Sequence, residues 1–136
     1  VAMKKLLLSS FALSALLACA ASGPMERSAR AEAELADELE NRIAGEPVSC
    51  VSQRDLRGHE AVGDGLILFE GKGEVDYLNH PRGGGCPNLN YGRTLVFRTT
   101  STRLCEGEVA SVVEAVSGGS YGSCILGEFT PYREAD

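Results

Sequence analysis

The chain has 136 residues, of which 43% are hydrophobic and 24% are charged, a composition typical of one globular domain and not of a disordered chain. Without Lys4 and Lys5 of the first segment, 11 basic residues stand against 19 acidic ones, which gives a net charge of −8. A field of this sign repels phosphate backbones and no basic stripe interrupts it, so the composition speaks against nucleic-acid binding.

The first segment has the pattern of an export signal. Lys4 and Lys5 precede an apolar run from Leu6 to Ala18. As a helix this run would rise only about 20 Å, which is less than the ~30 Å hydrocarbon core of a membrane. The pattern therefore predicts a signal peptide over residues 1–18 and not a membrane span.

The end of this apolar run predicts that a lipid attaches the mature chain to the membrane. Leu16-Leu17-Ala18-Cys19 resembles the lipobox of bacterial lipoproteins, which implies cleavage before Cys19 and lipidation of its sulfur. Ordinary cleavage after residues 18–20 is the alternative. A lipid on Cys19 would be the tie to the membrane. Because Ala20 is not the aspartate associated with inner-membrane retention, we expect an outer-membrane lipoprotein that faces the periplasm, where an envelope protein is the partner to consider.

A helix-forming segment follows the predicted tether. Good helix formers dominate from Ser22 to Ala44, and Pro47 ends the run. Its apolar stripe is thin and consists of Leu35, Leu39 and Ile43. We expect residues 19–46 to form a tether with a solvated spacer helix.

From residue 47 to residue 136 the pattern is that of a small all-β domain. Short apolar runs alternate with glycine turns at intervals of about eight to twelve residues. Strands are expected at Val48–Ser52, Leu66–Glu70, Glu74–Leu78, Arg93–Thr99, Glu108–Val116 and Tyr121–Phe129. The expected fold is all-β: an antiparallel barrel or sandwich of about six strands, stapled by disulfides and preceded by an N-terminal helix. The pattern does not choose between barrel and sandwich.

Four cysteines remain in this domain after either cleavage: Cys50, Cys86, Cys105 and Cys124. An even number in an exported domain predicts two disulfides, for which three connectivities are open. We favour Cys86–Cys105, which closes a local loop, together with Cys50–Cys124, which joins the first strand to the last. The wide spacing lacks the close cysteine pairs of zinc sites, so no metal is expected.

His59 lies in the cluster RDLRGHEAVGDG, with Asp55 and Asp64 nearby. A histidine and carboxylates can transfer protons or bind a metal. The second histidine of a His-Glu-x-x-His helix is missing, because Gly63 occupies its position. We therefore expect this cluster to be a surface turn.

A second candidate cluster contains His80 and Arg82, in NHPRGGGC. A pair of His80 and Cys86 would suggest a thiol nucleophile, but Cys86 is expected in a disulfide and the glycines predict a loop. No catalytic residue and no cofactor is therefore predicted. His59, Asp55, His80 and Arg82 are candidates for ligand binding. The expected function is a non-enzymatic binding or structural module, and the alternative is a small periplasmic hydrolase or thiol/redox protein.

Four runs carry a family resemblance: RDLRGHEAVGDGLILFEG, RGGGCPNL, RLCEGE and SCILGEFTPY. The chain resembles a family of small exported bacterial proteins of unknown function over residues 48–133. The Cys-Pro-x-Leu and Leu-Cys-x-Gly elements occur in the same order. The resemblance implies an envelope location and a common β fold, and it brings no established activity and no catalytic residues.

Overall fold

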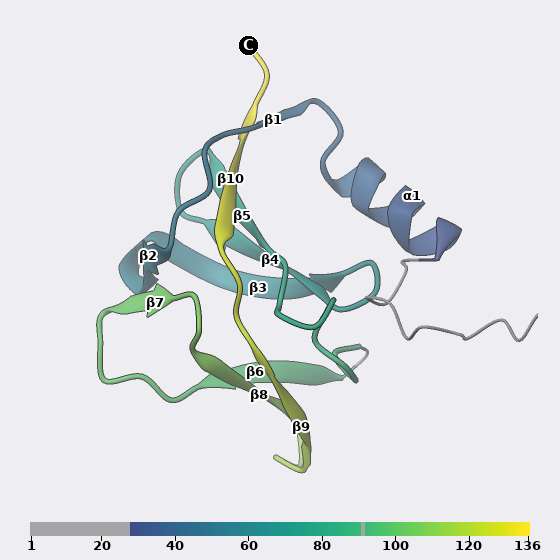
Figure 1. Ribbon diagram of the computed structural model, residues 1–136, viewed down its shortest axis with the longest axis vertical. Helices are drawn as coiled ribbons and strands as arrows, with labels where there is room; N and C mark the ends of the chain where they lie inside the picture. The colour runs from purple at the N-terminus through teal and green to yellow at the C-terminus, as the bar shows by residue number, and fades with distance from the viewer. Residues whose placement is uncertain (1–27, 91) are drawn as a thin grey trace, which may run out of the picture.

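The computed structural model describes residues 28–90 and 92–136 (Figure 1). The predicted signal peptide and Cys19 lie outside the described residues. The helices are α1 (Ala29–Glu38) and the short 3-10 helix η1 (Gln53–Asp55). The strands are β1 (Arg42–Ala44), β2 (Cys50–Ser52), β3 (Leu56–Val62), β4 (Leu66–Gly71), β5 (Val75–Asn79), β6 (Arg93–Phe97), β7 (Arg103–Cys105), β8 (Val109–Glu114), β9 (Ser120–Ile125) and β10 (Phe129–Glu134). In these ranges no helix is long and apolar enough to cross a membrane.

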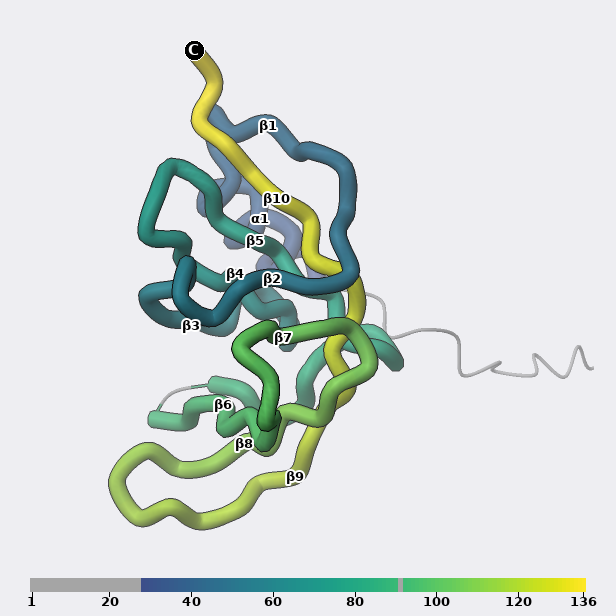
Figure 2. The backbone as a smooth tube through the Cα atoms, turned by 90° about the vertical axis from the view of Figure 1, so that its left-hand side faces the viewer, coloured from purple at the N-terminus to yellow at the C-terminus, as the bar shows by residue number. Residues whose placement is uncertain are grey.

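The strands form three antiparallel sheets. The largest has the order β1-β10-β5-β4-β3, a second has the order β6-β8-β9, and β2 pairs with β7 in a third. Figure 1 shows α1 on one side of the five-stranded sheet and the three-stranded sheet on the other. Figure 2 shows the β2–β7 pair at one side of the molecule, with β7 between the levels of these two sheets.

Alternating residues of β4 separate two apolar cores. Leu66 and Leu68 pack in a small core with Leu35 and Leu39, which come from α1. Ile67 and Phe69 of β4 belong to a larger core between the sheets. This core also includes Leu95, Leu104, Val112, Leu126 and Phe129. Burial of each such aliphatic side chain contributes about 1.5–3 kcal/mol, so the larger core holds the sheets face to face.

The mostly-β, antiparallel fold with a preceding helix confirms the expected class. The sheets are not closed into a barrel, so the barrel alternative is wrong. The chain instead has a sandwich-like arrangement of sheets, with β3 at the end of one sheet and β6 at the end of another. The expected number of about six strands was too small, because short strands such as β1 and β7 carry little periodicity.

The helix predicted as far as Ala44 ends at Glu38. Asn41 has a φ of 61°, which turns the chain out of the helix. Residues 42–44 then pair with β10 as β1, and Arg42 forms an ion pair with Asp76 of β5. The segment expected as a spacer therefore contributes a helix and a strand to the fold.

Two further expectations fail where side chains gave a misleading signal. The cluster around His59, predicted as a surface turn, is strand β3, which pairs with β4 over its whole length.

Tyr121–Phe129 is not one strand, because β9 ends at Ile125 and β10 begins at Phe129. Pro131, expected to end a strand, lies inside β10 opposite Gly45, just beyond the end of β1. Its carbonyl accepts the Gly45 N–H, and only the reciprocal bond on the β1 side is missing because proline has no N–H.

The four cysteines form two disulfides, as predicted, but the favoured pairing is wrong. Cys50 pairs with Cys105, and Cys86 pairs with Cys124. The first pair lies directly opposite in the β2–β7 register. The second joins the loop after β5 to β9, along which that loop runs. Sequence distance along the chain does not encode these neighbours.

A buried asparagine fastens β5 to the connection between β9 and β10. Asn79 has 0% of its surface exposed. Its side-chain amide donates to the carbonyl of Gly127 at 2.8 Å, and its Oδ1 accepts from the Gly127 N–H at 3.0 Å. Gly127 has no room for a side chain, because a Cβ would lie 2.1 Å from the carbonyl oxygen of His80.

Candidate functional site

Strands β3 and β6 face each other across an open seam. Two hollows lie along this seam, and His59 lines both of them. The first, the helix-side hollow, has a volume of about 520 Å³ and is lined by α1, β3 and the start of β6. The second, the Phe-side hollow, has a volume of about 180 Å³ and is lined in part by Leu56, Arg57, Phe69, Phe97 and Leu104.

His59 is the residue that joins the two edges of the seam. Its Nε2 accepts the backbone N–H of Leu95 at 3.1 Å and lies 3.2 Å from the hydroxyl of Thr94. Its ring packs near Phe69 and Phe97, with centroid distances of 5.9 Å and 5.8 Å. In the part of the chain that the structure describes, no other hydrogen bond joins β3 to β6.

The geometry fixes the tautomer of the neutral His59 imidazole. Because Nε2 accepts a backbone N–H, the proton of the neutral ring lies on Nδ1. Burial lowers the pKa of His59 from its usual 6.5, so the neutral ring is favoured at neutral pH. His59 thus acts as a hydrogen-bond acceptor for an edge strand, a role that leaves its basic nitrogen occupied.

Charges of both signs surround the helix-side hollow. Arg30, Glu34, Glu60, Asp64 and Arg93 line it. The pKa of Glu60 is raised, first by burial and then by the neighbouring carboxylates of α1, β4 and β5. Asp64 accepts the backbone N–H of Ser28 at 3.0 Å, which ties the start of α1 to the turn after β3. Such a surface suits a polar chain that carries both donors and acceptors.

Arg93 holds the wall of the helix-side hollow in place. Its guanidinium lies 3.7 Å from the ring centroid of Tyr121 in β9, a cation–π contact. It also donates to the carbonyl of Asn88 at 3.0 Å. These contacts fasten the loop before β6 to the far strand of the same sheet.

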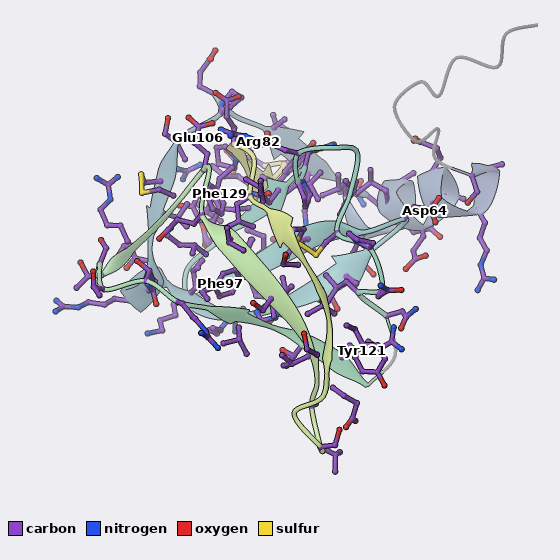
Figure 3. The ribbon with its side chains drawn as sticks, turned by 60° about the horizontal axis from the view of Figure 1, so that its bottom comes forward. Asp64, Arg82, Phe97, Glu106, Tyr121 and Phe129 are labelled. Atoms are coloured by element: carbon purple, nitrogen blue, oxygen red, sulfur yellow. A yellow bond between two sulfur atoms is a disulfide. The ribbon has the colours of Figure 1, made fainter. Side chains whose placement is uncertain are left out.

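The other candidates from the sequence lie elsewhere. Asp55 ends η1, and His80 and Arg82 lie exposed in the loop after β5; none of the three lines either hollow. Figure 3 places Arg82 near Glu106, away from Asp64, which lies beside α1. Of the acidic residues predicted around His59, the structure therefore brings Glu60 and Asp64 to the same hollow, but not Asp55.

Cys86 is not available as a partner for His80. It is 2% exposed and bonded to Cys124. Over residues 28–90 and 92–136 no three His, Cys, Asp or Glu side chains lie together as a metal site would require.

The partners of His59 were missed at the level of sequence. The Leu95 donor is a main-chain group 36 residues away, and main-chain groups leave no mark in a sequence. The one available signal was the alternation of Leu95 and Phe97 in the predicted strand, which indicated their inward face. It did not indicate what lay opposite.

One protein-family model, DUF6491, described as a family of unknown function, matches residues 2–134. No curated protein and no solved structure matches the chain. The resemblance to a family of unknown function is thereby confirmed, and it carries no activity.

Proposed function

The chain belongs to this family of unknown function, and we propose that it is an exported, lipid-tethered module that binds another envelope protein and catalyses no reaction. The binding face is the seam between β3 and β6. An extended segment of the partner adds to one of the two open strand edges. The observation that carries this proposal is that both edges of the seam lack a neighbouring strand while hollows lie on either side of His59.

The proposed cellular location rests on two features. The lipobox-like Leu16-Leu17-Ala18-Cys19 supports cleavage before Cys19, which lies outside the described residues. The two disulfides support an oxidising compartment, because disulfides are rare in cytosolic proteins. The tether then holds the domain at the outer membrane, on the periplasmic side.

The enzymatic alternative finds less support in the geometry. A thiol nucleophile would require a reduced cysteine, whereas Cys86 is buried in a disulfide. A histidine base would require a free basic nitrogen, whereas Nε2 of His59 is engaged by Leu95. A binding role needs neither group.

The edge of β6 supplies unpaired main-chain groups. Since the N–H of Leu95 points into the seam, the main-chain groups of Phe97, two residues on, point the same way. On its other side β6 pairs with β8. Open edges of this kind bind extended segments by strand addition, with flanking hollows that accept alternate side chains.

Site-specific photo-crosslinking in cells tests the proposal. A photoreactive residue replaces Arg57 or Asn90, which are exposed and line the two hollows, in the full chain. We expect one and the same envelope protein to be crosslinked from both positions. The matched control is Ala44, an exposed residue of β1 at the opposite edge of the same sheet, which should give no such adduct. Equal adducts from all three positions, or none from the seam, would refute the seam as the binding face.

A further inference from the structure

The two hollows are separated by one side chain. His59 lines both, and both hydrogen bonds that cross from β3 to β6 among the described residues end on its Nε2. Whether the Leu95 amide on the edge of β6 is free to pair with another chain therefore depends on the state of one imidazole.

Protonation reverses the chemistry of this contact. A neutral imidazole accepts the Leu95 N–H through Nε2, but both nitrogens of an imidazolium are donors. The Leu95 N–H then faces another N–H and loses its acceptor. The Thr94 hydroxyl can accept from the charged ring, so the Leu95 amide is the group that reports release.

The groups that face His59 leave it sensitive to acid. From β4 it meets Phe69, and from β6 it meets Thr94, Leu95 and Phe97. Leu104 of β7, also uncharged, lines the Phe-side hollow with it. The charged residues around the two hollows are Arg30 and Glu34 of α1, Arg57 and Glu60 of β3, Asp64 of the following turn and Arg93 of β6. Positive and negative side chains are both present, and none of them holds the imidazolium in an ion pair.

We propose that His59 is an acid-operated latch on the seam: the neutral ring accepts the Leu95 N–H and holds the edge of β6 to β3 there, and protonation releases that amide. Use of the released edge of β6 by a partner rests on the function proposed above, whereas the latch does not. It gives the binding face a dependence on pH.

The direction of the pH effect follows from burial. The pKa of His59 is lower in the folded chain than the ordinary 6.5, so the unfolded chain binds a proton first as the pH falls. The contribution of the latch to stability is fully present above pH 6.5 and is lost as the pH falls through the lower, folded pKa. The latch thus closes at neutral pH and opens in acid.

Amide hydrogen exchange tests the latch directly. The protection factor of the Leu95 amide is measured by NMR from about pH 7.5 to about pH 5, relative to that of Ile67 in the central strand β4, which corrects for global unfolding. We expect the relative protection of Leu95 to fall about tenfold as His59 becomes protonated, because the amide loses a hydrogen bond of about 0.5–1.5 kcal/mol. The ring ¹⁵N shifts of His59 should change over the same pH range.

Two variants separate the latch from a general effect of acid. In His59→Gln the side-chain oxygen can accept the Leu95 N–H and does not titrate, so the relative protection should not depend on pH. His80→Gln removes the other histidine of the chain and should behave as the wild type. Unchanged Leu95 protection in the wild type while the ring titrates, or an equal loss in His59→Gln, would overturn the latch.

The outcome is separable from that of the crosslinking experiment. If crosslinking at the seam fails while Leu95 loses protection in acid, the latch stands and the partner is rejected. If crosslinking succeeds while Leu95 stays protected in the protonated wild type, the seam binds without a latch.

Discussion

Replacement of both Cys86 and Cys124 by alanine will lower the free energy of unfolding by about 4 kcal/mol, from the chain-entropy estimate for a crosslink that spans 38 residues. In a domain of this size such a loss corresponds to a fall in melting temperature of well over about 10 °C. The measurement is thermal and urea unfolding of the domain without reductant. This disulfide ties the loop after β5 to β9, and that loop supplies Leu89 and Asn90 to the wall of the helix-side hollow.

The matched control is the second disulfide. Replacement of Cys50 and Cys105 removes a crosslink that spans 55 residues, so the entropic part of the loss is similar. The Cys86–Cys124 sulfurs are buried, whereas Cys50 and Cys105 are half-buried, so only the first replacement also opens a cavity in the core. We expect the Cys86/Cys124 variant to be the less stable of the two. A melting temperature that does not change in either variant would mean that the cysteines are not structural crosslinks.

The Asn79→Ala variant should lose about 2–6 kcal/mol of stability. It leaves the N–H and the carbonyl of Gly127 without their partner in a site closed to water, and each unsatisfied buried group costs about 1–3 kcal/mol. Urea unfolding measures the loss. Asn79→Asp keeps an acceptor for the Gly127 N–H but buries a charge and removes the donor, so it should not restore stability.

Asn90→Ala serves as the control for this clamp, since Asn90 is an exposed asparagine in the loop before β6. Its replacement should change the free energy of unfolding by less than about 0.5 kcal/mol. If Asn79→Ala were as mild as Asn90→Ala, the clamp between β5 and Gly127 would not contribute to the fold.

The fold could be predicted where side-chain periodicity follows burial. In Leu66–Glu70 the apolar residues that indicated a strand are those that pack in the two cores, and in Glu74–Leu78 the same is true of Tyr77 and Leu78. The even number of cysteines predicted two disulfides, because the number of possible pairs follows from the cysteine count alone. Both features can be recognised from residue type and spacing.

The rest depends on neighbours that are distant in sequence. The sequence of strand β3 favours a turn because Arg57, Gly58 and Glu60 leave no apolar alternation at the edge of a sheet. The cysteine pairing failed because the register of β2 with β7 sets Cys50 opposite Cys105. For His59 the sequence indicated a candidate ligand-binding residue in a surface turn, whereas its neighbours make it a hydrogen-bond acceptor between two sheets.

The intact mass of the protein, isolated without reductant from the membrane fraction of cells that express the full chain, tests most directly that this is an exported, disulfide-bonded and lipid-tethered module. The proposal predicts a chain that begins at Cys19, carries a lipid, and takes up no alkylating reagent because its other four cysteines form two disulfides. A chain that keeps residues 1–18 and takes up the reagent at its cysteines would contradict it.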